Sequence, residues 1–356
     1  MAFLEKEDCS ASLEKIRSRA SGEIYIAELP ESNGKMIAIK KVKQVDNSLL
    51  NIRMREVRAE IMTAGQIRHR NIVPLLAHMV RPDCHLLVSE FMKNGSLREI
   101  LNDVSQGRRE LEWLARHRIA RGIVSGLEYL HMYHRPRIIH RDIRPGNVLI
   151  DDDMEDRISD FGLAKVLPDG HTQIRSSNTD FGVAEVMPAG HAQVKTSNLA
   201  GTVGYIAPLC HQTLTFSDEC DIYSFGVLLA VLVMRKLPSD DFFQHTEEKS
   251  LVRWMRNVMT SENPNRAIDS KLLGNGYEEQ MLLVLKIACF CTLDDPEERP
   301  NSKDVRSMLS DTALIKDVDF LKMHKRMDFD NDDCVELIQQ EIYTEWLSSL
   351  DSYNPL

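Results

Sequence analysis

The stretch over residues 138–150, which reads IIHRDIRPGNVLI, constrains this chain more than any other. Apolar pairs flank a polar turn, which predicts a short strand, a tight loop and a second strand. The turn carries an acid, Asp142, and five residues later an amide, Asn147. A second acid, Asp160, follows Asp142 by eighteen residues and opens an Asp-Phe-Gly triplet. A chance acidic turn between two strands would not explain the order and spacing of all three residues.

This pattern resembles the catalytic loop and the metal-binding triplet of protein kinases. The resemblance implies an α+β, two-lobed protein-kinase fold with a small β-rich N-lobe and a larger helical C-lobe. It implies that Asp142 accepts the proton of a substrate hydroxyl, while Asn147 and Asp160 hold Mg²⁺. The usual lysine two positions after the catalytic aspartate is Arg144 here. Because arginine keeps the charge but is a planar fork, we expect reduced rather than abolished phosphate transfer.

The resemblance extends to a lysine and a glutamate earlier in the chain. Residues 36–40 (MIAIK) are similar to the kinase strand whose lysine, here Lys40, pairs with the α- and β-phosphates of ATP. Glu60, in a helix expected over residues 53–66, is then the ion-pair partner of Lys40. Together with Asp142 and Arg144, these two residues form the implied catalytic set. The implied nucleotide-binding positions are Gly22, Ile24, Ala38, Lys40, Ser89, Glu90, Met92, Asn147 and Leu149.

The glycine-rich loop that closes over ATP in this family is substituted. Its pattern is G-x-G-x-x-G, and when Gly22 takes the last position, Arg17 and Arg19 take the other two. Arginine has a Cβ and a long side chain, so the backbone cannot approach the phosphates in the usual way. Two interpretations remain open: the guanidinium groups attract phosphate, or the loop has decayed, which we favour.

Composition restricts the class of protein further. At 356 residues, with 43% hydrophobic and 28% charged residues, the chain has room for two lobes. A formal net charge of −10 argues against a nucleic-acid partner. The seven cysteines form no repeating framework, and Cys289 and Cys291 are separated by one residue, where zinc and redox motifs have two. We expect free, buried thiols in a reducing compartment.

The sequence predicts no membrane segment. Its longest apolar run, residues 225–234, is shorter than the about 20 residues that a spanning helix needs. The first residues after Met1 lack the pattern of a signal peptide. We therefore expect a cytoplasmic protein, or a domain on the cytosolic side of the plasma membrane if the chain is part of a longer receptor.

Residues 159–178 and 179–198 form a tandem repeat in which most differences are conservative. The first copy contains Asp160, and the second contains Asp180 after a polar stretch that does not predict a strand. We assign metal binding to Asp160 and interpret the second copy as an inserted loop in a duplicated activation segment. The hydroxyls that this segment offers for phosphorylation are Ser176, Ser177, Thr179, Thr196 and Ser197.

Residues 201–208 (GTVGYIAP) resemble the substrate-docking loop of Ser/Thr kinases. The resemblance implies that Thr202 lies near Asp142. The family continues with a glutamate, where this chain has Leu209. That glutamate normally pairs with a buried arginine, for which Arg299 is the candidate. Removing one partner of a buried ion pair costs about 3–5 kcal/mol, so we expect a weakened C-lobe unless Glu297 or Glu298 takes the empty place.

Beyond the docking loop the chain reads as helical and then changes. Asp221 opens a strongly apolar helix, and the resemblance implies that it ties the catalytic loop to that helix. A simple role at the helix N-terminus is the other interpretation. The C-terminal tail, residues 311–356, departs from the kinase pattern. Apolar residues on one helical face predict an amphipathic helix over residues 335–350.

As a whole, the chain resembles the cytosolic kinase domain of plant leucine-rich-repeat receptor-like kinases. The resemblance covers a kinase domain over residues 12–310, with an N-lobe over about 12–92 and a C-lobe over about 93–310. Short stretches such as residues 81–85 (RPDCH) are similar to adaptor members of that family, which associate with receptor-like proteins.

The resemblance implies a function and leaves one alternative open. It implies ATP and Mg²⁺ as cofactors, serine/threonine phosphorylation of protein substrates, and receptor-like proteins or co-receptor kinases as further partners. The alternative is a pseudokinase that acts as a binding or scaffold module. The substituted glycine loop, Leu209 and the lengthened activation segment favour that alternative.

Overall fold

The computed structural model describes residues 14–19, 22–29, 32, 34–43, 48–167, 174–175, 201–213 and 215–310. The second copy of the repeat, including Asp180, lies outside these residues, as do the candidate phosphorylation sites and the C-terminal tail with its expected amphipathic helix.

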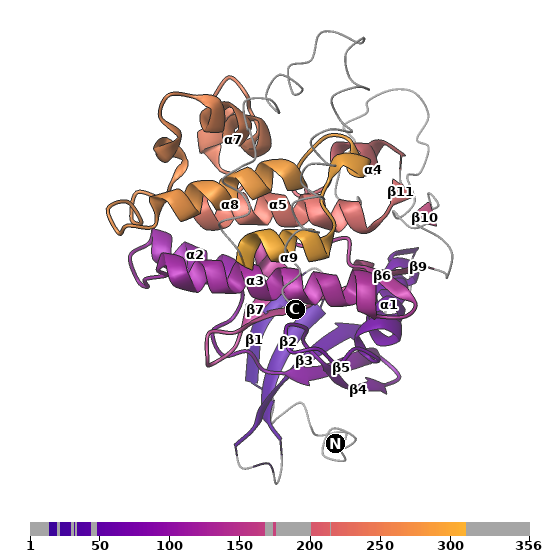
Figure 1. The fold of residues 1–356 in the computed structure, drawn as a ribbon. Helices are drawn as coiled ribbons and strands as arrows, with labels where there is room; N and C mark the ends of the chain where they lie inside the picture. The colour runs from indigo at the N-terminus through magenta and orange to yellow at the C-terminus, as the bar shows by residue number, and fades with distance from the viewer. Residues whose placement is uncertain are drawn as a thin grey trace, which may run out of the picture.

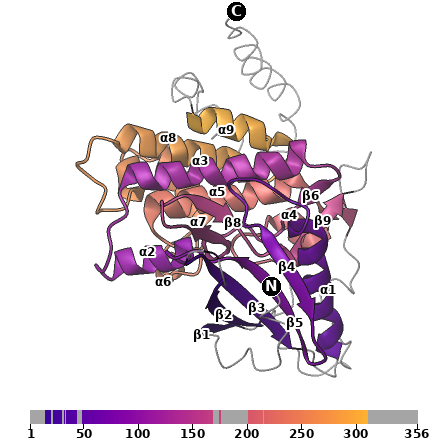
Figure 2. The same ribbon diagram turned by 90° about the horizontal axis from the view of Figure 1, so that it is seen from below.

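The N-lobe is a five-stranded antiparallel sheet with the strand order β1-β2-β3-β5-β4. Its strands are β1 (Glu14–Arg19), β2 (Gly22–Glu28), β3 (Met36–Lys43), β4 (Leu75–Val80) and β5 (Cys84–Glu90). Helix α1 (Ser48–Ala64) lies beside the sheet, as Figure 2 shows. This helix begins five residues before the expected start at residue 53 and contains Glu60 as predicted.

The C-lobe is a stack of helices above the sheet (Figure 1). Its centre is α5 (Asp218–Met234), in which every residue from Cys220 to Met234 is buried. Helix α5 packs against α8 (Glu278–Cys291) and α3 (Trp113–Glu128), which in turn contacts α9 (Ser302–Ser310). The remaining helices are α2 (Leu97–Ser105), α4 (Pro208–Thr213), α6 (Asp241–Gln244) and α7 (Leu251–Thr260).

Short two-stranded sheets position the catalytic loop between the lobes. The loop joins β6 (Arg137–Ile139) to β7 (Val148–Ile150), which confirms the strand–loop–strand prediction for this stretch. Strand β6 pairs with β9 (Lys165–Leu167), and β7 pairs with β8 (Asp156–Ile158). A third pair joins β10 (Ile174–Arg175) to β11 (Thr215–Phe216). Residues 160–164 connect β8 to β9 and therefore lie next to the catalytic loop.

The cysteine prediction is partly wrong. Cys84, Cys289 and Cys291 are free and buried, as expected. Cys210 and Cys220, in contrast, form a disulfide. Their spacing of ten residues matches no familiar motif, and only the fold of the intervening segment brings them together. Cys9 and Cys334 lie outside the described residues. Within the described chain, no helix has the length and apolar composition needed to cross a bilayer.

A buried ionic network joins three C-lobe elements. The Arg116 side chain in α3 is fully buried, and its Nη2 donates to Oδ2 of Asp269 at 2.8 Å. Arg235, at the end of α5, donates to the same carboxylate from Nε at 2.7 Å and from Nη2 at 2.9 Å. Carbonyl oxygens of Leu111 and Leu232 accept the other Arg116 hydrogen bonds. The network is therefore fully bonded in the folded state.

We expect Asp269→Asn to lower the free energy of unfolding by about 3–5 kcal/mol, because it leaves a buried guanidinium without its counter-charge. Chemical denaturation measures this loss. The matched control is Asp152→Asn, which removes an exposed carboxylate that lies 3.8 Å from Lys93 Nζ and should cost less than about 1 kcal/mol. Equal losses in the two variants would contradict the account of the network.

Candidate active site

The ammonium of Lys40 lies between two carboxylates that come from different parts of the chain. Its Nζ is 2.9 Å from Oε2 of Glu60 in α1 and 3.0 Å from Oδ1 of Asp160. The expected Lys40–Glu60 ion pair is therefore formed. Burial alone would lower the pKa of Lys40, but the two carboxylates raise it above its ordinary value. The Lys40 charge in turn lowers the pKa of Asp160, so that this carboxylate stays ionised.

The catalytic loop is held by Asp221 in the first turn of α5. Its Oδ2 accepts a hydrogen bond from the backbone N–H of His140, and its Oδ1 accepts one from Arg141, both at 2.7 Å. Arg141 adopts a left-handed backbone conformation with φ of 72°, which these bonds help to hold. The implied tie between Asp221 and the catalytic loop is thus present. Burial alone would raise the pKa of Asp221, but its hydrogen bonds keep the pKa below the ordinary value.

A third partner of Asp221 was not predicted. His131 Nε2 lies 3.0 Å from Oδ2 of Asp221, and both side chains are buried. His131 sits in a π-helical turn (Tyr129–Tyr133) that follows α3, ninety residues before Asp221 in the chain. No local sequence pattern links two residues at that separation, so this contact could only come from the fold.

Three side chains orient the carboxylate of Asp142. Nδ2 of Asn147 donates to its Oδ2 at 2.6 Å, and Nε of Arg144 donates to the same oxygen at 2.9 Å. The hydroxyl of Thr202 donates to Oδ1 at 2.8 Å, which matches the implied position of the docking loop. The carboxylate therefore points at the hydroxyl that the docking loop presents, a geometry suited to accepting a proton from an alcohol.

The amide oxygen of Asn147 is suited to a metal ion. Oδ1 of Asn147 is buried and accepts no hydrogen bond from the described residues, while Nδ2 is occupied by Asp142. Asp160 lines the same cavity as Asn147. Within the described residues no three His, Cys, Asp or Glu side chains gather at a metal-binding site. A carboxylate and an amide oxygen, with phosphate and water completing the shell, are what Mg²⁺ accepts.

A cavity of about 480 Å³ opens between the lobes next to these groups. It has the size of a small-molecule site. Eight of the nine predicted nucleotide-binding positions line it, namely Ile24, Ala38, Lys40, Ser89, Glu90, Met92, Asn147 and Leu149. Gly22 does not line it. The side chain of Glu90, at the connection between the lobes, is bound by Arg157 at 2.8 Å and by Lys35 at 2.7 Å.

The glycine-loop region is a tight β-hairpin. Strands β1 and β2 are separated only by residues 20–21, so Arg17 and Arg19 lie within β1, with their backbones opposite Ile24 and Gly22. Gly22 has φ of 141°, and a Cβ there would lie 2.6 Å from the carbonyl oxygen of Lys41. Gly22 is therefore required by the sheet itself. The side chains of both arginines lie outside the described structure, so their relation to phosphate stays a prediction.

Arg299, the candidate partner of the family's glutamate, is bonded to backbone oxygens where this chain has Leu209. Leu209 is 41% exposed. The buried Arg299 guanidinium donates to the carbonyl oxygens of Leu293, Glu219 and Asp294 at 2.7–3.1 Å. Its Cζ also lies 5.0 Å from the ring centroid of Tyr223. Backbone oxygens thus accept the hydrogen bonds of the arginine, and the effect of Leu209 on the stability of the C-lobe stays a prediction.

Comparison with known proteins agrees with this geometry. The family model described as "Protein kinase domain" matches residues 13–311, so the chain belongs to the protein kinase family. Within that family it belongs to the plant leucine-rich-repeat receptor-like kinases, as three relatives indicate.

The first of these, the leucine-rich repeat receptor-like serine/threonine/tyrosine-protein kinase SOBIR1 of Arabidopsis thaliana, is 60% identical over 320 residues, covering 87% of this chain and 47% of that protein. The inactive leucine-rich repeat receptor-like protein kinase CORYNE, also from Arabidopsis thaliana, is 31% identical and covers 85% of this chain and 70% of that protein. The brassinosteroid LRR receptor kinase BRI1 of Oryza sativa subsp. japonica is 36% identical over 309 residues, which cover 86% of this chain and 25% of that protein. The chain thus spans about half the length of SOBIR1.

We expect Asp221→Asn to lower the free energy of unfolding by about 1–3 kcal/mol, because an amide can accept only one of the two backbone hydrogen bonds. Thermal or chemical unfolding measures this change. Asp218→Asn is the matched control, since Asp218 lies in the same helical turn and its Oδ2 is 3.5 Å from Nη1 of the partly exposed Arg137. A control variant that lost as much stability would contradict the role assigned to Asp221.

Proposed function

We propose that this chain is the cytosolic kinase domain of a plant receptor-like kinase and transfers the γ-phosphate of ATP to serine or threonine hydroxyls of protein substrates. The single observation that carries the proposal is the placement of the Asp142 carboxylate. It is hydrogen-bonded to Thr202 and to Asn147, and Asn147 lines the interlobe cavity together with Lys40, Glu60 and Asp160. A base for the hydroxyl, a cation for the phosphates and metal ligands thus come together.

In this proposal each residue has a separate task. Lys40, held by Glu60, binds the α- and β-phosphates, and Asp142 accepts the proton of the attacking hydroxyl. Asn147 and Asp160 would hold Mg²⁺, which when bound neutralises the charge that develops on the phosphates. Ser89, Glu90 and Met92 form the wall of the cavity between the lobes, where the adenine would bind.

The wider setting is also part of the proposal. The relative SOBIR1 is named a serine/threonine/tyrosine kinase, so tyrosine is a second candidate acceptor. We propose that the domain works on the cytosolic side of the plasma membrane, as an adaptor with receptor-like proteins or co-receptor kinases as partners.

A pseudokinase that binds partners without catalysis is the second candidate. Two observations favour it: the arginines at the glycine positions of β1, and the relative CORYNE, which is named inactive. The intact Lys40–Glu60 pair and the oriented Asp142 favour the enzyme.

Phosphate transfer from ATP in the presence of Mg²⁺ decides between the two candidates. We expect the purified chain to phosphorylate itself or a generic protein substrate, and we expect Asp142→Asn to reduce the rate by about 100-fold or more, because the hydroxyl loses its base. If the wild-type chain transferred no more phosphate than the Asp142→Asn variant, the result would contradict the enzyme and favour the binding module.

We expect Arg144→Lys to raise kcat by about threefold to tenfold. Nε of Arg144 is committed to the Asp142 carboxylate, whereas a lysine ammonium is a point charge on a flexible stem that can follow the transferring phosphate. Steady-state kinetics measures this change. Arg137→Lys, at a partly exposed arginine three residues before His140, is the control and should leave kcat unchanged. A fall in kcat for Arg144→Lys would contradict this expectation and show that the planar guanidinium of Arg144 is needed.

A further inference from the structure

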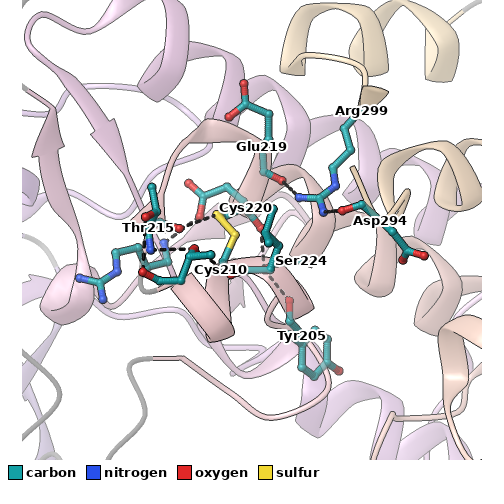
Figure 3. The surroundings of a disulfide bond; sticks show 12 residues. Tyr205, Cys210, Thr215, Glu219, Cys220, Ser224, Asp294 and Arg299 are labelled. Atoms are coloured by element: carbon teal, nitrogen blue, oxygen red, sulfur yellow. Dashed lines mark hydrogen bonds between the residues drawn. A yellow bond between two sulfur atoms is a disulfide. The ribbon is translucent and has the colours of Figure 1, made fainter. Parts of the chain in front are cut away.

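Helix α4 buries one of its described side chains, that of Cys210, in the C-lobe. It follows the docking loop directly, and Pro208, Leu209, Gln212 and Thr213 are exposed. Among the described side chains of this helix, only that of Cys210 is buried, at 3% exposure. Its partner in the disulfide is Cys220, in the first turn of α5 (Figure 3). Without this bond, little of α4 that the structure describes is packed against the lobe.

The disulfide joins α4 to the turn that organises the catalytic loop. Cys220 is adjacent to Asp221, which accepts the backbone N–H groups of His140 and Arg141. One turn later, Ser224 Oγ donates to the carbonyl oxygen of Tyr205 in the docking loop at 2.7 Å. Figure 3 shows both links on the same side of α5. The docking loop is thus tied to α5 by one covalent bond and one hydrogen bond.

Leu209, the residue before Cys210, cannot form an ion pair with α5 or with Arg299. Leu209 is apolar and exposed, and the Arg299 guanidinium donates to backbone carbonyl oxygens, one of them that of Glu219 beside Cys220 (Figure 3). Among the described contacts, the disulfide is therefore the strong link between α4 and α5.

We propose that the Cys210–Cys220 pair is a reversible thiol–disulfide modification site that controls how firmly segment 201–213 is held beside Asp142. The proposal rests on the proposed kinase function for its effect on activity, because Thr202 of this segment touches the Asp142 carboxylate. In a reducing compartment, disulfides are typically transient and redox-sensing, which matches a site that changes state.

The chemistry involves two electrons and two protons. A dithiol reductant attacks one sulfur, the Cys210–Cys220 bond breaks, and the mixed disulfide resolves to give two protein thiols and an oxidised, cyclic reductant. In the reverse direction, hydrogen peroxide accepts two electrons from the two thiols, which yields the disulfide and two molecules of water. Access needs only a local opening of α4, whose other described side chains already face solvent.

The remaining described cysteines are suited to serve as internal controls. Cys84, Cys289 and Cys291 are buried and free. Burial raises the pKa of Cys289 to about 12 and also raises the pKa of Cys291, which lowers the thiolate fraction of both at neutral pH. They are present in wild-type and variant chains alike, so a redox response that they caused would persist when Cys210 and Cys220 are replaced.

Hydrogen exchange of the backbone amides in segment 201–213 tests the proposal. The full chain is compared after treatment with hydrogen peroxide and after treatment with dithiothreitol. We expect exchange in this segment to be about tenfold faster or more in the reduced protein, because closing a loop of this length restricts the opened state. Peptide mapping after alkylation should find the Cys210–Cys220 link only in the oxidised protein. Equal exchange in both states, or no such link after oxidation, would overturn the proposal.

The double variant Cys210→Ser, Cys220→Ser supplies the matched control. Its exchange in segment 201–213 should equal that of the reduced wild-type chain and should not respond to reductant. A response that persisted in the variant would assign the effect to another thiol and overturn the proposal. Should the variant fail to fold, the exchange and mapping results on the wild-type chain decide alone.

A kinase assay separates this proposal from the proposed function. If both hold, reduction should raise the KM for a protein substrate several-fold and change the KM for ATP little, since α4 lies outside the nucleotide cavity. Exchange that responds to reductant without any phosphate transfer supports the modification site and contradicts the kinase. Transfer in both redox states with unchanged exchange supports the kinase and contradicts the modification site.

Discussion

The site depends on the ion pairs that the ammonium of Lys40 forms with two carboxylates. The ammonium pairs with Glu60 from α1 and with Asp160 at the start of the Asp-Phe-Gly triplet. Lys40 of strand β3 therefore connects helix α1 with the start of the Asp-Phe-Gly triplet. If α1 moved away, Lys40 would lose a buried partner, and Asp160 would lose the arrangement that keeps it ionised and beside Asn147. The charge of Lys40 in the N-lobe sheet thus holds Asp160 in the cavity that Asn147 of the catalytic loop also lines.

Much of this arrangement could be predicted from the sequence because its residues lie in short, rigid patterns. The catalytic loop is a strand–turn–strand unit, so Asp142 and Asn147 are placed by local geometry. The resemblance to kinases implied the pairing of Lys40 with Glu60, and the patterns of the strand and the helix agreed with it. The resemblance likewise implied the tie between Asp221, at the start of an apolar helix, and the catalytic loop. In each case the local pattern and the tertiary contact agree.

Other features could not be predicted because distant parts of the chain create them. His131 reaches Asp221 across ninety residues, and the Cys210–Cys220 bond depends on how the docking loop turns into α5. The partners of Arg299 are another example. Carbonyl oxygens of Leu293, Glu219 and Asp294 accept its hydrogen bonds, and a sequence does not show where backbone oxygens will lie. Covalent and backbone contacts thus stabilise a segment whose side-chain chemistry departs from the family.

We expect the cluster of Lys40, Asp160 and Asn147 to bind nucleotide with a metal despite the substituted glycine loop. Calorimetric titration of the chain with ATP, in Mg²⁺ and again in a chelator, tests it most directly. The account predicts binding that requires Mg²⁺ and that weakens at least about tenfold, or 1.4 kcal/mol, in Asp160→Asn. Absence of binding under all conditions, or equal affinity of the wild-type and variant chains, would contradict it.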